Sequence, residues 1–542
     1  MTMSVSADLS RPWSWSLEGL EAPWGDRPSL YQHILAHIRP GEPGLAPDGE
    51  KLPDWKCVEE GQPIRWAPGA LDGVFGHYTE GVEPEETAQE ILDALRALTR
   101  KATAERAAAL YEFLAGSPAI QYVDHLLSAV LADERLPRDR VREIARWFAT
   151  GASDREAVKI AIALLGLFRD TEDHGLLFAL GRHEELTLYA AVALGNSAEQ
   201  PARLLWDLAR QVHGWGRIQT VERLFQSSDP EISAWLLREG YRNNVLHEYT
   251  ALTCAHTGDL ISALRCPDPD DELLTGAAEI LTALLRGRQG PAEGIGDYLG
   301  GSEAAALYLG HLRWRAHLGL EHLLAAHALW QFVQEEDGDV QEPELDWEMF
   351  RETILENAGA ILARPEWPEI VQNGLRSSDS SIFRQAAEAA RVLEIDAWDL
   401  IFERLQRGED VWSYVVQTAD PERIDRVVAL AQERLPLEEI ATGPAEELGF
   451  GPGYWDHREL DFVLQALRRF PGHGWPLLRA ALQSPVISNR DMAASALATW
   501  GRAAWPPDAE FLLRSAFAHE PDEETREVLG RVIAGEPLED SL

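Results

Sequence analysis

The chain has little cysteine and no long apolar run. Of its 542 residues only three are cysteines, Cys57, Cys254 and Cys266, which are too few and too scattered for a disulfide framework or a cysteine-based zinc site. No basic segment followed by an apolar core opens the sequence, as a secretory signal peptide would require. The longest apolar runs, such as residues 160–168, fall far short of a membrane span. These absences predict a cytoplasmic protein without a membrane segment.

Positive charge is also scarce, and arginine supplies most of it. The chain has 90 acidic and 49 basic residues, a formal net charge of -41. Only four of the basic residues are lysines, Lys51, Lys56, Lys101 and Lys159. Binding of nucleic acid through its phosphates requires concentrated positive charge, so we expect neither nucleic acid nor an anionic membrane as a partner. The acidity either serves solubility or favours a protein partner with a basic contact face.

Motifs that carry chemistry are missing as well. The sequence has no phosphate-binding glycine loop, no dinucleotide-binding fingerprint and no nucleophile elbow. An acidic loop places Asp337, Asp339 and Glu348 at three EF-hand positions, but Glu342 stands where that loop requires glycine; only unspecific binding of divalent ions stays open. The predicted helix Tyr308–Val333 carries four histidines, and none of their spacings puts two of them on one face. We therefore predict no catalytic residue, no cofactor and no metal site.

What the sequence does contain is a repeated apolar helix. Superimposing Gly166 on Gly195 aligns two such helices within residues 153–196, with a shorter helix predicted between them at about residues 173–180. A helix that is apolar on more than one face must be covered by neighbours, so the unit is expected to stack on copies of itself. An Ala-Ala-x-x-Leu signature, or a variant ending in alanine, recurs at 190–194, 277–281, 386–390 and 493–497. Turns that supply N-caps precede several helices, at 227–230, 267–270 and 377–379.

This pattern of paired helices, Asp/Pro turns and an alanine-rich second helix resembles the HEAT-repeat (armadillo-type) superfamily, including the HEAT-like repeats of bilin lyases. The resemblance covers residues 85–535 and is clearest at 153–196, 375–406 and 484–535. It implies an all-α fold, a right-handed α-α superhelix of the HEAT-like solenoid type, whose concave face binds a partner. It does not imply any single activity.

Composition divides the chain into six segments. Residues 1–82 are rich in tryptophan, proline and glycine and predict an irregular, aromatic-rich N-terminal cap over the end of the first repeat, with one helix at about residues 29–38. The remaining segments are a first solenoid arc at 83–333, an acidic loop at 334–348, a second arc at 349–439, a Gly/Pro loop at 440–458, and C-terminal repeats with a tail at 459–542.

Three stretches are candidates for binding. The most basic one, residues 135–147, interleaves its arginines with Asp139 and Glu143, which favours a solvated helix over a phosphate-binding patch. A pocket between the cap and the first repeats is the second candidate, but large aromatic residues in an irregular segment usually serve packing, which favours the cap over the pocket. The third candidate is a set of aromatic and arginine side chains that would anchor a partner in the concave groove of the superhelix. The candidate residues are Trp66, Asp72 and His77 for the pocket, and Arg313, Trp314 and Arg315 for the groove.

The sequence thus predicts a non-enzymatic helical-repeat scaffold, of a size and acidity that fit a bacterial protein. It would bind a protein with a basic contact face through aromatic and arginine anchors. The alternative is a HEAT-like enzyme or small-ligand binder, similar to bilin lyases or to alkylpurine DNA glycosylases, with a pocket near the N-terminal cap. The glycosylase alternative needs a basic concave face, which the composition opposes, whereas the lyase alternative stays open. The oligomeric state is not indicated.

Overall fold

The structure is a computed structural model, and it describes residues 15–55, 67–74, 84–225, 227–288, 290, 292–335 and 347–538. Within these residues the chain is all-helical, as the sequence predicts, and the only extended pairing consists of two isolated bridges, Ile38 with Leu45 and Glu447 with Val486. Two compact units are present: the N-terminal unit ends at Leu362 and the C-terminal unit begins at Ala363. The division into arcs at the acidic loop and the Gly/Pro loop stays a prediction.

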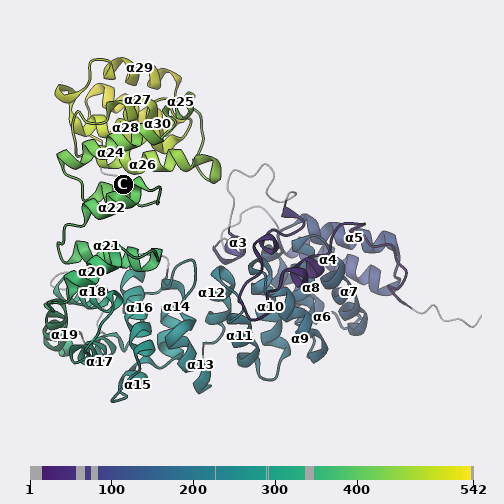
Figure 1. The fold of residues 1–542 in the computed structure, drawn as a ribbon. Helices are drawn as coiled ribbons and strands as arrows, with labels where there is room; N and C mark the ends of the chain where they lie inside the picture. Colours follow the sequence, from purple (N-terminus) through teal and green to yellow (C-terminus); the bar gives the residue numbers. More distant parts are fainter. Residues whose placement is uncertain are drawn as a thin grey trace, which may run out of the picture. The chain divides into compact units, whose positions relative to one another are not determined.

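The N-terminal unit is coloured from purple to teal in Figure 1. Its α-helices are α1 (Leu30–His37), α3 (Ala70–Val74), α4 (Pro84–Arg100), α5 (Ala104–Gly116), α6 (Val123–Ala132), α7 (Arg138–Gly151), α8 (Arg155–Leu165), α9 (His174–Leu180), α10 (Glu184–Ser197), α11 (Pro201–Ala209), α12 (Gly214–Glu222), α13 (Pro230–Trp235), α14 (Glu248–Thr257), α15 (Leu260–Leu264), α16 (Asp271–Gly287), α17 (Gly301–Arg313), α18 (Leu320–Glu335) and α19 (Trp347–Leu362). Short 3-10 or π turns are η1 (Pro47–Glu50), η2 (Ala119–Gln121), η3 (Thr171–Asp173), η4 (Leu236–Gly240) and η5 (Ile295–Asp297).

The C-terminal unit, green to yellow in Figure 1, continues the same pattern. Its helices are α20 (Trp367–Leu375), α21 (Ser380–Val392), α22 (Trp398–Gln406), α23 (Trp412–Gln417), α24 (Pro421–Arg434), α25 (Leu437–Ile440), α26 (Trp455–Leu467), α27 (Trp475–Ala481), α28 (Ile487–Trp500), α29 (Ala509–His519) and α30 (Glu523–Ala534). The turns η6 (Pro452–Tyr454) and η7 (Arg502–Ala504) lie between them. As the sequence predicts, Pro506-Pro507 ends one stretch and two short helices follow.

Alternate helices pack on one another in succession. In the N-terminal unit, α8 contacts α10, and the series continues through α12, α14 and α16 to α18; in the C-terminal unit, α26 contacts α28 and α28 contacts α30. The alanine-rich signature lies on α10, α16, α21 and α28, and its small residues are buried. Small side chains let neighbouring helices approach closely. At Gly166, the C-cap of α8, an added Cβ would lie 2.7 Å from the Cα of Ala193 on α10.

The predicted N-caps are confirmed. Asp229, Asp270 and Asp379 each accept a hydrogen bond from the backbone of the first turn, of α13, α16 and α21 respectively. Such a cap satisfies one of the backbone donors that a helix start leaves free. The helix boundaries at these turns are therefore set by local sequence.

Two predicted elements are wrong. The single helix Tyr308–Val333 is two helices, because α17 ends at Arg313 and α18 begins at Leu320. The chain turns between them so that α18 packs on α16 and α19 instead of extending α17. Residues 1–82, predicted as irregular apart from one helix at about residues 29–38, contain the further short helix α3 among their described residues, and α3 packs on α10 and α12.

The described part of residues 1–82 lies against several helices. Trp24 packs on Tyr111, Trp147 and Phe148 of α5 and α7, and Arg27 forms an ion pair with Asp154 at 2.6 Å. The segment also contacts α9 through α1, and α10 and α12 through α3. It is therefore not confined to the end of the first helix pair, where the sequence placed it, because its polar and aromatic groups find partners as far along as α12.

Candidate functional site

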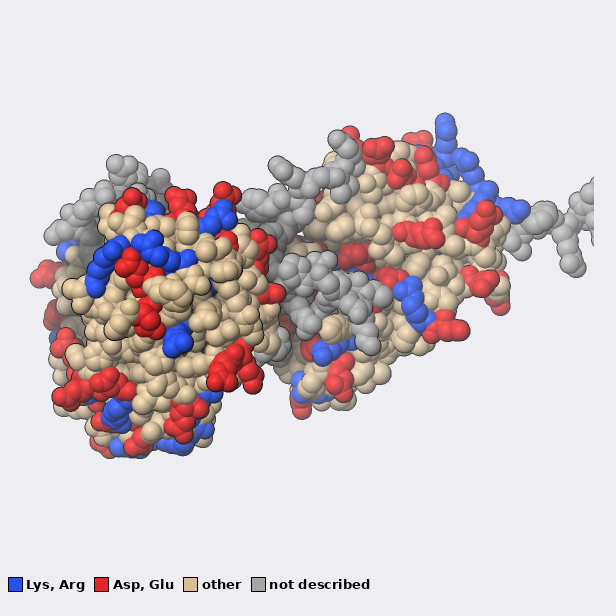
Figure 2. All heavy atoms as spheres, turned by 90° about the horizontal axis from the view of Figure 1, so that it is seen from above, with Lys and Arg blue, Asp and Glu red and all other residues tan. Residues whose placement is uncertain are grey.

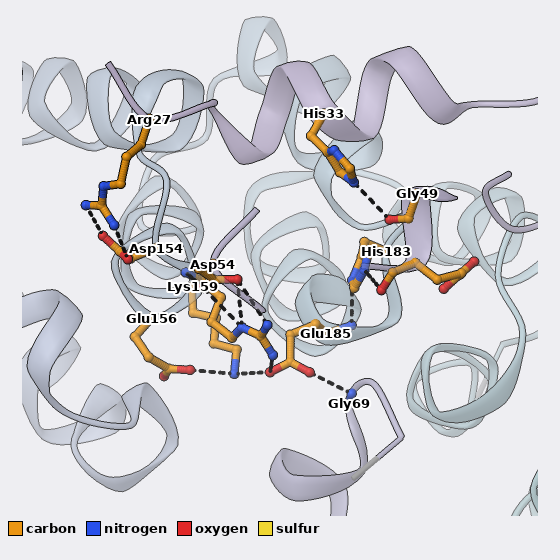
Figure 3. Close-up of polar contacts among 12 residues, drawn as sticks. Arg27, His33, Gly49, Asp54, Gly69, Asp154, Glu156, Lys159, His183 and Glu185 are labelled. Atoms are coloured by element: carbon orange, nitrogen blue, oxygen red, sulfur yellow. Dashed lines mark hydrogen bonds and ion pairs between the residues drawn. The ribbon is translucent and has the colours of Figure 1, made fainter. Parts of the chain in front are cut away.

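The densest group of buried charges in the described residues lies beneath the N-terminal segment (Figure 3). Lys159 of α8 is 1% exposed. Its Nζ lies 2.8 Å from Asp72 Oδ2, 3.0 Å from Glu156 Oε1 and 2.8 Å from Glu185 Oε1. An ammonium group has three donors, and Glu156 and Glu185 accept hydrogen bonds from this one. The contact with Asp72 is an ion pair rather than a well-aligned hydrogen bond.

Three elements bring these groups together. Helix α8 places Arg155, Glu156 and Lys159 within one turn of each other, and Glu185 comes from the first turn of α10. The N-terminal segment contributes Asp54, whose carboxylate accepts hydrogen bonds from the backbone N of Arg155 at 2.8 Å and from its Nη2 at 3.0 Å.

The same segment contributes Asp72 from α3 and the backbone N of Gly69, which donates to Glu185 Oε2 at 3.0 Å. We call the six side chains Asp54, Asp72, Arg155, Glu156, Lys159 and Glu185 the Lys159 cluster. The cluster joins the N-terminal segment to α8 and α10.

Opposite charges and burial set the protonation states in the Lys159 cluster. Burial opposes the charge on Lys159, but Glu156, Glu185 and Asp72 outweigh it and raise the pKa of the lysine well above its ordinary value. Burial likewise opposes ionisation of Glu185, yet Lys159 and Arg155 lower its pKa to about 2. A lysine held protonated in this way cannot act as a nucleophile or base at neutral pH.

Asp72 behaves differently from Glu185. Burial raises the pKa of Asp72 to about 6, and the attraction of Lys159 only partly offsets this. Burial also raises the pKa of the neighbouring Glu184 to about 7, to which the charge of Glu50 adds. Both carboxyl groups therefore take up protons close to neutral pH, unlike ordinary carboxylates.

Two buried hydroxyl groups face this region without a hydrogen-bond partner among the described residues. The Tyr122 and Tyr189 side chains are 0% and 4% exposed, and neither hydroxyl is bonded. The ring of Tyr189 lies 5.7 Å from Lys159 Nζ. Burial raises the pKa of both phenols well above the ordinary value, with Glu156 among the contributing charges. A buried hydroxyl without a partner is costly.

Of the three residues predicted to line a pocket, the structure describes only Asp72. Asp72 belongs to the Lys159 cluster, whereas Trp66 and His77 lie outside the described residues. The partners Lys159 and Glu185 were not singled out from the sequence. One signal was available for Lys159: it is the last lysine of the chain and interrupts the apolar run of residues 157–165.

Of the predicted groove residues, Trp314 is exposed, and Arg313 and Arg315 flank it in the chain. Trp314, directly after α17, is 82% exposed, the largest exposed fraction among the large hydrophobic residues described. The guanidinium of Arg313 lies 5.4 Å from the centre of its ring. Arg313 Nη1 also donates to Glu356 Oε1 and to Asn357 Oδ1 of α19, each at 2.9 Å.

Arg315 is held on the other side of Trp314. Its Nη1 lies 3.0 Å from Asp271 Oδ1 and its Nη2 lies 3.2 Å from Asp268 Oδ1. It also donates to the carbonyl of Pro269. The backbone that carries Trp314 is therefore tied to α19 through one arginine and to the start of α16 through the other.

Two arginines of the basic stretch at residues 135–147 are also paired with carboxylates. Arg142 pairs with Asp170 at 2.7 Å and with Asp173 at 2.7 Å, and Arg146 pairs with Asp173 at 2.6 Å. The sequence had predicted partners within the stretch itself, Asp139 and Glu143. The partners of Arg142 and Arg146 come instead from the turn before α9. Figure 2 shows acidic side chains spread over the face that it draws, with most basic side chains beside them.

Within the described residues no group of three or more His, Cys, Asp or Glu side chains is arranged to hold a metal ion. Of the histidines weighed as metal ligands, His311 bonds the carbonyl of Leu264 at 2.7 Å and His322 bonds the hydroxyl of Tyr308 at 2.9 Å. None of the helices in the described ranges has the length and apolar character to cross a membrane. The chain matches no protein-family model and no curated protein.

Proposed function

We propose that this chain is a non-enzymatic helical-repeat scaffold that binds a protein partner with a basic contact face. The architecture we propose is a right-handed HEAT-like superhelix with an N-terminal cap. It is supported by the successive packing of alternate helices and by the buried alanine-rich signature at their contacts. Stacked helix pairs present an extended surface that repeat proteins use for binding.

The observation that carries the proposal is the exposure of Trp314. A tryptophan that is 82% exposed leaves a large apolar area in water, and burial of such a side chain contributes roughly 1.5–3 kcal/mol. Tryptophan and arginine are the residues most enriched at binding hot spots. Because Arg313 and Arg315 fix the neighbouring backbone, little conformational freedom remains to be lost on binding.

Charge favours a basic protein over nucleic acid. The net charge of -41 produces a negative potential that attracts a cationic partner. Arg142 and Arg146 of the stretch weighed as a phosphate-binding patch are held by carboxylates of a neighbouring segment, and so are the groove residues Arg313 and Arg315. They offer little free positive charge to a phosphate backbone.

Affinity purification of the full chain from its own organism tests the proposal. We expect a protein that is retained by the wild type and lost with Trp314→Ser. The matched control is Phe113→Ser, which removes an aromatic ring that is 41% exposed on α5. Retention of the same protein by both variants, or of none by the wild type, contradicts the proposal.

A second function, binding of a small polar ligand near the N-terminal cap, is favoured by the two unpartnered hydroxyls of Tyr122 and Tyr189. Native mass spectrometry of protein purified from its own organism tests it. A bound small molecule that is lost in Tyr189→Phe supports a ligand site like that of a HEAT-like enzyme. If the mass equals that of the bare chain, the hydroxyls serve the protein alone.

A further inference from the structure

One segment of the C-terminal unit exposes three large apolar side chains within a short stretch. Leu448, Phe450 and Trp455 are 51%, 58% and 53% exposed. They belong to residues 443–455, which join α25 to α26 and which we call the aromatic loop. Single exposed apolar residues are ordinary, but a group of them marks a binding surface.

The aromatic loop is fixed by backbone pairing. Glu447 forms a parallel bridge with Val486, and the backbone N of Ile487 donates to the carbonyl of Glu447 at 3.0 Å. At the start of the loop, the backbone N of Gly443 donates to the carbonyl of Gln483 at 2.8 Å. The loop is therefore tied to the segment that precedes α28.

Gly449 explains why its neighbours face outward. This glycine is buried, although Leu448 and Phe450 on either side are exposed. Its φ is +74°, and an added Cβ would lie 2.8 Å from Val486 Cγ1. Only glycine combines a positive φ with so close an approach. The backbone thus packs directly on Val486 while both adjacent side chains stay in solvent.

The far end of the loop is bonded back to its beginning. The hydroxyl of Tyr454 donates to Glu447 Oε2 at 2.7 Å. Trp455 begins α26, and the guanidinium of Arg458 lies 5.1 Å from the centre of its ring. The aromatic groups therefore project from a backbone with fixed ends, and ordering of the loop on binding costs little entropy.

The border of the aromatic loop is acidic. Burial raises the pKa of Glu459, and the nearby charges of Asp410 and Asp456 add to the rise. Asp410 and Asp456 therefore lie close to Glu459, where the loop enters α26. Residues 446–459 contain four acidic side chains against one arginine: Glu446, Glu447, Asp456 and Glu459 against Arg458.

We propose that the aromatic loop is a docking surface for a basic amphipathic segment of a partner protein. Large apolar side chains of that segment cover Leu448, Phe450 and Trp455, and its Lys or Arg side chains meet the acidic border. Charge complementarity selects a basic segment over an acidic one. The inference rests on the proposed scaffold function and adds to it the chemistry of the partner and a contact site in the C-terminal unit.

Selection of a displayed library of random peptides against the full chain tests the inference. We expect the enriched peptides to combine Lys or Arg with large apolar residues. Their affinity should fall roughly 10-fold or more with Phe450→Ser or Trp455→Ser, as for the loss of an aromatic anchor. Phe511→Ser, which removes a ring that is 74% exposed elsewhere in the same unit, should leave the affinity unchanged.

A second variant, Gly449→Ala, retains all three apolar side chains but displaces the loop from Val486. It should weaken the selected peptides as well, while circular dichroism confirms that the helices remain. Enrichment of acidic or wholly polar peptides, or no enrichment, overturns the inference. Equal binding by wild type and the loop variants also overturns it. If Trp314→Ser alone abolishes binding, the scaffold proposal stands and the assignment of the aromatic loop falls.

Discussion

Replacement of Lys159 by methionine should destabilise the N-terminal unit strongly. The substitution leaves the buried Asp72 and Glu185 and the partly buried Glu156 without the ammonium group that lies within 3.0 Å of each of them. Removal of one member of a buried ion pair costs about 3–5 kcal/mol. The lowering of the Glu185 pKa from 4.5 to about 2 independently corresponds to about 3 kcal/mol. We therefore expect a fall of about 5–10 °C in the unfolding midpoint at neutral pH.

The pH dependence of this effect has a definite sign. The pKa of Glu185 is depressed in the folded state, so its contribution is present above about pH 4.5 and is lost as pH falls toward 2. The difference between wild type and Lys159→Met should therefore shrink in acid. The double variant with Glu185→Gln should recover part of the loss, because it removes one of the stranded charges.

Thermal and urea unfolding, followed by circular dichroism, measure the effect. The control is Lys51→Met, which removes an exposed lysine 5.3 Å from the ring of Trp55 and should cost at most about 1 kcal/mol. If Lys159→Met unfolds within about 1 kcal/mol of the wild type, or if the double variant is less stable than the single one, the buried cluster does not hold the N-terminal segment as described.

Three further predictions follow from the structure. Gly166→Ala should destabilise the fold, because the added Cβ would lie 2.7 Å from the Cα of Ala193. Gly195→Ala should stabilise it by about 0.5–1 kcal/mol, because an added Cβ there meets nothing within 4 Å. Urea unfolding compares the two variants. The raised pKa values of Asp72, about 6, and Glu184, about 7, mean that the folded state binds more protons than the unfolded chain. The contribution of these two carboxyl groups to stability should thus grow as pH falls from about 8 to about 5. Over that range the wild type should gain stability relative to the double variant Asp72→Asn with Glu184→Gln, but not relative to Glu90→Gln on the surface. Gel-shift titration should detect no binding of duplex DNA at physiological salt, and micromolar affinity would restore the glycosylase-like alternative.

Local features of the fold could be predicted from the sequence. Helices were found from apolar periodicity, and their starts from aspartates such as Asp270, because both signals are local in the sequence. The helix predicted across residues 308–333 failed because apolar residues continue through the turn between α17 and α18. Helix α3 was missed because its five residues are stabilised by packing on α10 and α12 rather than by any local signal.

The residues of the candidate sites were harder to predict from the sequence than the helices. Asp72 was singled out, but its partner Lys159 lies far along the chain, and periodicity carries no information about a contact of that kind. The residues around Trp314 were recognised because arginine and tryptophan side by side are typical of binding anchors. The aromatic loop was predicted only as a loop, since its exposed side chains depend on the packing of Gly449 against Val486.

The most direct test of the scaffold proposal is the association rate between the full chain and the protein that it captures, measured at increasing salt concentration. Exposed charges are screened over about 8 Å at physiological ionic strength, so the attraction of a basic face to a chain of net charge -41 acts mainly on approach. We predict that the association rate falls steeply with added salt while the dissociation rate changes little. An association rate independent of salt, or one that rises with salt, would contradict the basic contact face.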